Sequence, residues 1–275
     1  METRSSLNYL TTNFQATGFA VVSNLYPPLE VAAILQCVKN ALFYESSFGK
    51  NQEVFAIRGL LDEIPDLWPL LDTVGLRMLL AQVFPQGCHL AKAMYFDKPS
   101  LLNWRVAWHQ DVMINVNGRM ELPGFGPWTS KAEGVSVQPP VAVLENMCTL
   151  RIHLDDCDAG NGALKVVPGS HQLGVLPLAA LAEYTPEAVG CEVPAGGVML
   201  MRPLLLHASN RNTTDRPRRV LHLEFASTEL PAGLQWRERR AVALPQVSVL
   251  NAPTTVQHLT QQQIEGEAEA QRRSA

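Results

Sequence analysis

The residues with the clearest chemical potential lie in the segment Trp108-His-Gln-Asp111. His109 and Asp111 are two positions apart, and alternate residues of a strand project from the same face, so an imidazole and a carboxylate would converge there. An ordinary hydrogen bond between the two at the end of a strand is an equally simple interpretation. The pair becomes a candidate metal site only if a third ligand from elsewhere in the chain meets it.

A third candidate ligand, His207, ends the apolar stretch of residues 198–207. In isolation, a histidine in such a stretch is more often a packed core residue than a ligand. Two histidines and one aspartate, however, form the ligand set of non-haem Fe(II) oxygenases, which leaves coordination positions open for a cosubstrate and O₂. Arg218 follows eleven residues later, and a guanidinium fork can hold a carboxylate through two hydrogen bonds. These four residues together predict a metal site beside a carboxylate-binding position.

Composition sets the class of protein that carries this site. The chain has 275 residues and a formal net charge of -4, with 47% hydrophobic and 17% charged residues, which predicts a globular protein with a sizeable core. The acidic total disfavours a non-specific nucleic-acid binder, and no apolar run reaches the roughly 18 residues that span a bilayer. The five cysteines are scattered and residues 1–13 lack an apolar signal core, so we expect reduced thiols and a cytoplasmic protein without nucleic-acid or membrane partners.

The elements that must position the site are mainly short strands. Apolar residues at helical spacing predict helices near residues 29–42 and 72–84, and a short strand opening is expected at 14–23. After residue 88, turn residues separate short apolar segments, which favours a sandwich, barrel or jelly roll over a βαβ fold. The predicted strands are residues 89–96, 106–114, 147–154, 163–167, 198–201, 204–208 and 218–225. The Gly- and Pro-rich region 117–140 is interpreted as a long loop that acts as a lid.

The chain resembles the phytanoyl-CoA dioxygenase (PhyH-like) family of Fe(II)/2-oxoglutarate-dependent oxygenases over residues 14–226. The similar segments are residues 108–111, 161–171 (NGALKVVPGSH), His207-Ala-Ser followed by Arg218, and 17–22 (TGFAVV) with the helix behind it. The resemblance implies a mainly β fold with flanking α, namely a double-stranded β-helix (jelly roll, cupin-like) with N-terminal helices packed on one sheet.

A single domain is expected over residues 1–264. We divide it into a helical part at about 1–88, a barrel at about 89–226 and a C-terminal extension at 227–264. Residues 265–275 are charged and lack an apolar face, so they are expected to form a flexible tail.

The resemblance also implies roles for individual residues. Fe(II) would be held by His109, Asp111 and His207, and the C5 carboxylate of the cosubstrate 2-oxoglutarate by Arg218 with help from Ser209. The implied reaction oxidises an unactivated C–H bond of a small molecule, with hydroxylation as the default, while O₂ is consumed and 2-oxoglutarate becomes succinate and CO₂. Halogenating members carry Gly or Ala instead of the carboxylate, so Asp111 favours hydroxylation or a related oxidation. Desaturation and ring formation would use the same residues.

Other polar and aromatic residues have two interpretations each. In residues 149–155 polar and apolar side chains alternate, so Arg151 and His153 either face solvent or lie inside the jelly roll, where they would anchor a polar or anionic substrate. Tyr95 either hydrogen-bonds 2-oxoglutarate or packs in the core. Trp128, in the expected lid, is a candidate substrate contact.

Two alternative functions stay open at this point. One is a cupin-like metalloprotein without 2-oxoglutarate chemistry, which gives Arg218 and Ser209 no role. The other is a non-catalytic small-molecule-binding jelly roll, which predicts erosion of a ligand set that is complete here. Substrates in the family include amino acids, acyl thioesters and natural-product scaffolds, and the fold does not choose among them. The net charge of -4 disfavours highly anionic substrates unless a local basic patch overrides it.

Overall fold

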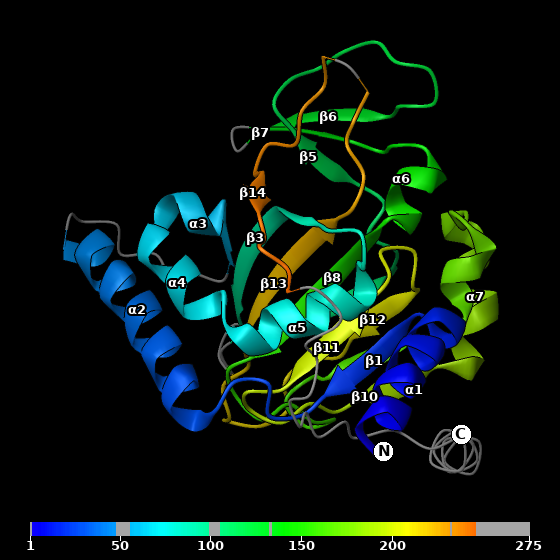
Figure 1. Ribbon diagram of the computed structural model, residues 1–275. Coiled ribbons are helices and arrows are strands. Elements are labelled where there is room, and N and C mark those ends of the chain that lie inside the picture. Colours follow the sequence, from blue (N-terminus) through cyan, green and yellow to red (C-terminus); the bar gives the residue numbers. More distant parts are fainter. Residues whose placement is uncertain (1, 48–55, 99–104, 132–133, 232, 246–275) are drawn as a thin grey trace.

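Two facing antiparallel sheets, with helices on the outer face of the larger one, form the body of the protein in this computed structural model (Figure 1). The structure describes residues 2–47, 56–98, 105–131, 134–231 and 233–245. The large sheet runs in the order β1 (Phe19–Val22), β11 (Val198–Met201), β8 (Met147–His153), β13 (Arg219–Ala226), β3 (His89–Asp97) and β14 (Arg240–Ala241), with β2 (Ala56–Arg58) also paired to β3. The facing sheet runs β10 (Val189–Cys191), β9 (Leu164–Val166), β12 (His207–Ser209) and β4 (Val106–His109).

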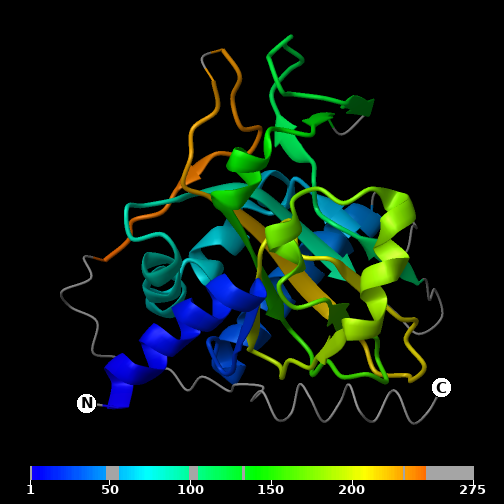
Figure 2. The same cartoon turned by 90° about the vertical axis from the view of Figure 1, so that its right-hand side faces the viewer.

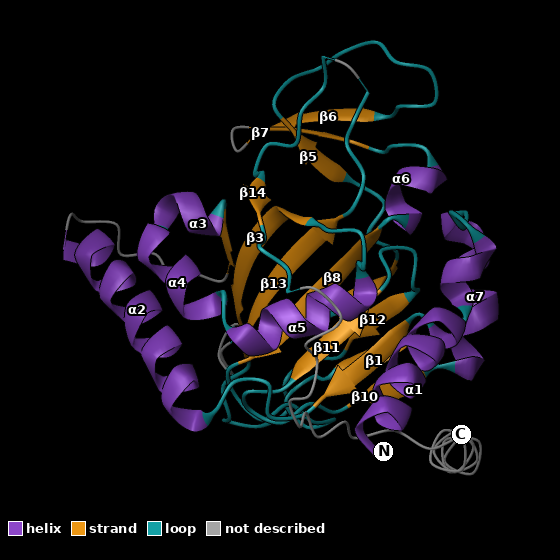
Figure 3. Cartoon of the chain, viewed as in Figure 1, coloured by secondary structure: helices purple, strands orange, loops and turns teal. Residues whose placement is uncertain are grey.

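The helices lie mostly N-terminal to the strands and cover one face of the large sheet (Figure 3). They are α1 (Glu2–Thr17), α2 (Pro28–Ser47), α3 (Leu60–Glu63), α4 (Trp68–Leu71), α5 (Val74–Val83), α6 (Val141–Glu145) and α7 (Leu181–Tyr184). Helix α5 begins after Thr73, whose side-chain oxygen accepts a hydrogen bond from the Leu76 N–H, as a helix N-cap does. The mainly β fold with flanking helices that the sequence predicted is therefore confirmed.

Along each strand of the large sheet, side chains project alternately toward the helices and toward the facing sheet. Leu150 and Leu223 point toward the helices and pack in one core cluster with Leu80. Met199 and Met201, on the other face, pack instead against residues of the facing sheet. Because successive residues of a strand project to opposite sides, the polar residues in register with these methionines lie between the two sheets.

A third, three-stranded sheet stands above the two facing sheets, next to the segment that follows β13 (Figures 1 and 2). Its order is β5 (Ile114–Val116), β7 (Gly134–Val137) and β6 (Trp128–Lys131). The prediction of a long loop over 117–140 is therefore wrong in part, because two strands of this sheet arise within it. Each has only four residues and is flanked by Gly and Pro, so its period-two pattern is too short to stand out in the sequence.

Other boundaries also differ from the predicted ones. The single strand expected at 106–114 is divided into β4 and β5 by residues 110–113, and of residues 204–208 only the end belongs to β12. At the N-terminus, α1 continues to Thr17, and β1 begins after Gly18, whose φ of 84° ends the helix. The N-terminal part also contributes strands β1 and β2 to the large sheet. The expected tail at 265–275 lies outside the described residues.

Two expectations about the chemical character of the chain can be compared with the structure. All five cysteines lie in the described part of the chain, and none of them forms a disulfide there. Within the described ranges, none of the helices combines the length and apolar character that crossing a membrane requires.

Candidate functional site

Three potential metal ligands converge at one end of the small facing sheet. His109 ends β4 and is directly paired with His207, the first residue of β12. Asp111 lies just beyond β4, and its backbone N–H donates to the Pro203 carbonyl at 2.8 Å, which holds it beside the start of β12. The Asp111 oxygens lie 3.7 Å from Nε2 of His109 and 3.7 Å from Nε2 of His207. All three ligand atoms fall within 4.8 Å of one another, a spacing that one metal ion could bridge.

Hydrogen bonds fix the protonation pattern of both histidines. Nδ1 of His109 contacts the Ala107 carbonyl at 2.8 Å, and Nδ1 of His207 contacts the Leu205 carbonyl at 2.9 Å. A carbonyl can only accept, so each Nδ1 carries a hydrogen, and in the neutral imidazole this leaves the Nε2 lone pair for a metal ion. Burial lowers the pKa of His207 to about 4, which keeps it neutral. Burial alone would raise the pKa of the Asp111 carboxyl, but the neighbouring imidazoles hold it below its usual range.

The facing strand of the large sheet carries a polar row into the space between the sheets. Every residue of β8 is buried, so the solvent-facing interpretation of Arg151 and His153 is wrong. Arg151 and Thr149 pair across the sheet with Met199 and Met201, which places them on the inner face. Burial lowers the pKa of Arg151 to about 10 and that of His153 well below its ordinary value, so Arg151 stays cationic and His153 neutral at pH 7.

A chain of hydrogen bonds orients Arg151. Its Nη1 donates to Nδ1 of His222 at 3.0 Å, because a guanidinium has only donors. The His222 hydrogen therefore sits on Nε2, which donates to Oε1 of Glu224 at 3.1 Å. The Lys92 ammonium donates to the same carboxylate oxygen at 2.8 Å. His222 thus connects Arg151 of β8 to the buried pair of Glu224 in β13 and Lys92 in β3.

Arg218 precedes β13 and is 5% exposed. Its Nη1 donates to the carbonyl oxygen of Gly162. Among the described residues, no carboxylate forms an ion pair with it. Burial lowers its pKa. Arg218 is thus a buried cation whose charge the described chain leaves without an acidic partner.

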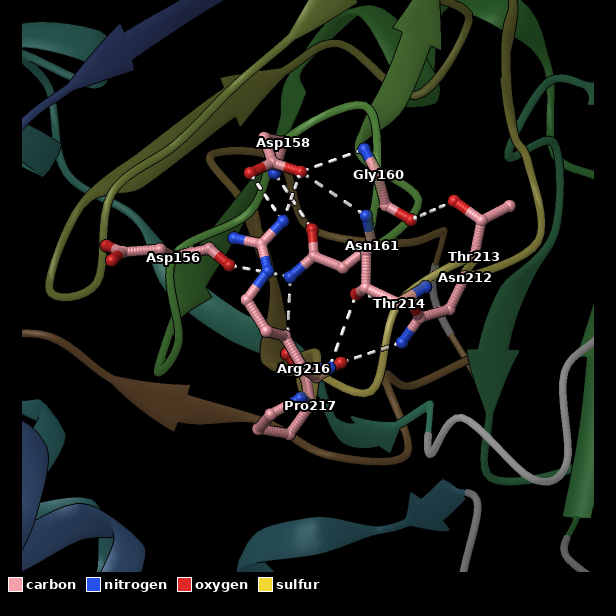
Figure 4. Close-up of polar contacts among 9 residues, drawn as sticks. All are labelled: Asp156, Asp158, Gly160, Asn161, Asn212, Thr213, Thr214, Arg216 and Pro217. Carbon is pink, nitrogen blue, oxygen red and sulfur yellow. Dashed lines mark hydrogen bonds and ion pairs between the residues drawn. The ribbon is translucent and has the colours of Figure 1, made fainter.

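Hydrogen bonds join the turn 156–162 to the segment 212–217, which directly precedes Arg218 (Figure 4). The Asn161 side-chain amide donates to the carbonyl oxygens of Asp156 at 2.7 Å and Pro217 at 3.3 Å. Arg216 donates to both oxygens of the Asp158 carboxylate at 2.7 Å. This network fixes the residues that adjoin Gly162 and Arg218, and so holds the arginine in place.

Lys98 is a buried basic residue of this region that sequence reasoning missed. Its backbone N–H donates to the Arg218 carbonyl at 3.1 Å, and its Nζ donates to the Asn210 carbonyl. Burial, followed by the charge of Arg218, lowers the pKa of Lys98 to about 8. The signal in the sequence was hidden, because Lys98 lies in Asp-Lys-Pro, which is typical of a solvent-exposed turn.

Several buried polar atoms around this space lack a hydrogen-bond partner. They are Oδ2 of Asp111, Oγ1 of Thr149, Nε of Arg151, both ring nitrogens of His153, Oγ of Ser209 and Nε of Arg218. Buried polar atoms are satisfied in nearly all native proteins, so such a concentration marks a site built for a polar ligand. Two imidazoles and a carboxylate suit Fe(II), and the buried donors at Arg218 and Ser209 suit a carboxylate.

The structure does not bring two of the predicted contacts to this space. Tyr95 alternates with Met94 along β3 and lies in the core beneath the helices, where its hydroxyl is 3.3 Å from Oδ2 of Asp97. Trp128 packs with the apolar face of the three-stranded sheet, in the cluster that contains Val137. Its neighbour Thr129 points the other way and lines a cavity. Trp128 itself does not line that cavity.

Comparison with known proteins places this geometry in context. The family model described as phytanoyl-CoA dioxygenase (PhyH) matches residues 14–220. AviO1 from Streptomyces viridochromogenes Tue57 superposes with a TM-score of 0.60 at 21% identity, over 82% of this chain and 96% of that one. EctD from S. alaskensis gives 0.64 at 20% identity, over 86% and 85%. SnoN, described as a non-heme alpha ketoglutarate dependent epimerase, gives 0.59 at 16% identity, over 88% and 97%. These similarities show a shared fold.

Proposed function

Because the chain belongs to the phytanoyl-CoA dioxygenase family, we propose that it is an Fe(II)- and 2-oxoglutarate-dependent oxygenase that hydroxylates an unactivated C–H bond of a small molecule. The observation that carries the proposal is the triad of His109, Asp111 and His207, whose ligand atoms lie within 4.8 Å with both imidazole Nε2 atoms presented to the centre. EctD has been crystallised with bound Fe and with 2-oxoglutarate and 5-hydroxyectoine, and SnoN with Fe³⁺ and alpha ketoglutarate, which supports the same cofactors here.

The proposed roles of the chain's residues follow from their placement. His109, Asp111 and His207 hold Fe(II), which together with 2-oxoglutarate would supply the O₂ activation needed to oxidise an unactivated C–H bond. Arg218 binds the C5 carboxylate of 2-oxoglutarate, and Ser209, on the same face of β12 as His207, donates to it. Arg218 and Ser209 are both buried, so hydrogen bonds that they form to a carboxylate are stronger there than on the surface.

Arg151 and His153 are proposed to contact the substrate from the large sheet. Arg151 is held by His222, yet its Nε lacks a partner, and both nitrogens of His153 are free among the described residues. A substrate with hydrogen-bonding groups would satisfy these atoms. This placement favours a polar small molecule over a purely aliphatic one.

The buried charge of Arg218 favours this function over that of a metalloprotein that does not use 2-oxoglutarate. A buried guanidinium without a counter-charge is costly, and such groups are normally paired in native proteins. Arg218 is 5% exposed and forms no ion pair with the described chain, so an anion from outside fits its surroundings. The C5 carboxylate of 2-oxoglutarate is such an anion. A metalloprotein that works without this cosubstrate would leave Arg218 without one.

Anaerobic spectroscopy tests the proposed function. Addition of Fe(II) and then 2-oxoglutarate to the protein should produce the visible charge-transfer absorption of a chelate. His207→Ala should lose it, whereas His171→Ala should keep it, because His171 contacts the Gln15 carbonyl far from the triad. Succinate release across a panel of amino acids, acyl thioesters and natural-product scaffolds should then identify the substrate class. If Fe(II) binds but no absorption develops with 2-oxoglutarate, the proposal is wrong.

A further inference from the structure

A cavity of about 300 Å³ opens between the edge of the large sheet and the three-stranded sheet above it. Four basic side chains line it, and no carboxylate of the described residues does. The basic residues are Arg58, Lys92, Lys131 and Arg237. The cavity lining is thus positively charged, although the whole chain has a formal net charge of -4.

The sheet register explains why these residues meet. Arg58 is the last residue of β2 and pairs with Met94, which in turn pairs with His222, so Arg58 lies on the inner face of the large sheet at its edge. In the three-stranded sheet, Thr129 and Lys131 of β6 share the face that looks over the cavity. Arg58 of β2 and Lys131 of β6 are far apart in the sequence, and both reach this cavity.

Arg237 comes from the segment after β13, which continues the three-stranded sheet. Its backbone N–H donates to the Asn115 carbonyl at 3.1 Å. Its guanidinium lies across Gly134, where an added Cβ would come within 1.9 Å of Nη1. Gly134 has a φ of 133°, which glycine adopts readily. Because Gly134 has no side chain, the β6–β7 hairpin leaves room for the Arg237 guanidinium. A side chain at position 134 would occupy that room.

Most of this positive charge has no partner within the described chain. Lys92 is paired with Glu224, but Arg58, Lys131 and Arg237 are exposed and form no ion pair with any described residue. Like charges that converge without counter-charges repel one another. An arrangement of this kind is stabilised when an anion binds among them.

The cavity lies next to the triad. Its lining includes Met113, two residues after Asp111, and Met94, which pairs across the large sheet with His222, the hydrogen-bond partner of Arg151. A ligand in the cavity would therefore have one end at the three exposed cations and the other directed toward the metal ligands. That is the orientation that a substrate with a terminal charged group requires.

We propose that the cavity is the substrate's anion-binding subsite, and that the substrate carries a phosphate or carboxylate group held by Arg58, Lys131 and Arg237. This inference rests on the proposed oxygenase function and specifies its substrate class. Arginine forks bind both oxyanions through paired hydrogen bonds, and the lysine adds a mobile donor. The local charge thereby overrides the unfavourable net charge of the whole chain.

Binding of three small aromatic probes tests the subsite. Phenyl phosphate, benzoate and neutral benzyl alcohol are added to the full chain at low salt, with saturating 2-oxoglutarate and Zn(II) so that Arg218 is occupied. Line broadening of the probe's ring protons in NMR reports binding. We expect phenyl phosphate or benzoate to bind at least about tenfold more tightly than benzyl alcohol, and salt to weaken that binding. Preference between the two anions identifies a phosphate or a carboxylate.

Charge-neutralising variants locate the probe. The triple variant Arg58→Gln, Lys131→Gln and Arg237→Gln should weaken binding of the preferred anion about tenfold. Arg119→Gln is the matched control, because Arg119 is exposed, pairs with Glu121 and does not line the cavity. Gly134→Ala, which displaces Arg237 without changing charge, should also weaken binding, provided that circular dichroism shows a folded protein.

The outcomes separate this inference from the proposed function. Equal binding of all three probes, or equal loss in the triple variant and in Arg119→Gln, would overturn the subsite even if the anaerobic chelate absorption forms. Anion binding that depends on Arg58, Lys131 and Arg237 in a protein that forms no chelate would support the subsite and reject the oxygenase. Binding lost only in Arg218→Ala would assign the probe to the other pocket and contradict the proposal.

Discussion

At the residue scale, the site is defined by which ring nitrogen of each histidine carries a hydrogen. Backbone carbonyls fix the hydrogens of His109 and His207 on Nδ1, whereas Arg151 and Glu224 fix the hydrogen of His222 on Nε2. The two metal-ligand candidates are therefore prepared to bind through Nε2 before any metal arrives. Such preorganisation reduces the reorientation that ligand binding would otherwise require.

Arg218 provides the residue-scale prediction. Arg218→Ala should raise the 2-oxoglutarate concentration needed for half-maximal chelate absorption by about tenfold or more, because a charge-assisted hydrogen bond contributes roughly 1.5–3 kcal/mol. Fe(II) binding without 2-oxoglutarate should change little. Arg211→Ala, an exposed arginine outside the site, is the control. An unchanged requirement in Arg218→Ala would show that another residue binds the carboxylate.

Residue type and short spacing were sufficient to predict that His109 and Asp111 converge, but not the surrounding contacts. His109 and Asp111 are two apart and their chemistry is distinctive, so their convergence could be expected. For Tyr95 the residue type left two interpretations open, and it packs in the core, whereas Trp128, expected in a lid, lies in strand β6 on the face that packs in an apolar cluster. The face of the sheet on which a side chain lies depends on the pairing register of its strand, because a shift of one residue reverses the face. Tertiary contacts decide that register.

At the scale of elements, the outer edge of β3 shows how the large sheet is completed. Strand β2 pairs with Met94 to Phe96 and β14 pairs with His89 and Leu90, which leaves a gap between them. The Glu238 carboxylate fills the gap by accepting the Ala93 N–H at 3.0 Å. A side chain thus satisfies a backbone donor that no strand reaches.

Glu238 therefore makes stability depend on pH. Burial raises its pKa from 4.5 to about 7, with the charge of Asp62 adding to the shift. Between these values the folded state binds more protons than the unfolded state, so stability is fully present below pH 4.5 and decreases as the pH rises to about 7. The loss should reach about 3 kcal/mol. Urea unfolding of the parent and of Glu238→Gln, which keeps an acceptor oxygen, at pH 5 and 8 measures it. An equal pH dependence in both proteins would contradict this account.

The three-stranded sheet marks the limit of element prediction from this sequence. Strands β6 and β7 have four residues each within a Gly- and Pro-rich region, and local composition there favours a loop. Their pairing with β5 is what makes them strands. The same pairing brings Lys131 close to Arg58 and Arg237, so the basic cavity could not be anticipated from any single segment.

At the scale of the whole molecule, the two facing sheets divide the site between them. His109 and His207 belong to the small sheet and Asp111 adjoins it, whereas Arg218 adjoins β13 of the large sheet. If 2-oxoglutarate chelates a metal at the triad and also contacts Arg218, it connects the two sheets.

This division predicts linked stabilisation by metal and cosubstrate. A ligand that binds only the folded state adds about 2.7 kcal/mol at 100 times its Kd, which corresponds to an increase in Tm of about 5 °C for a chain of this size. Zn(II), which does not change oxidation state, should raise the Tm modestly, and 2-oxoglutarate should add a further increase only when the metal is present. In His207→Ala the response to both should disappear, and in Arg218→Ala only the 2-oxoglutarate increment should be lost. Differential scanning fluorimetry with succinate as the control ligand measures these shifts. An equal increase by 2-oxoglutarate with and without Zn(II) would mean that the cosubstrate does not bridge metal and arginine, and that the two sheets are joined by protein contacts alone.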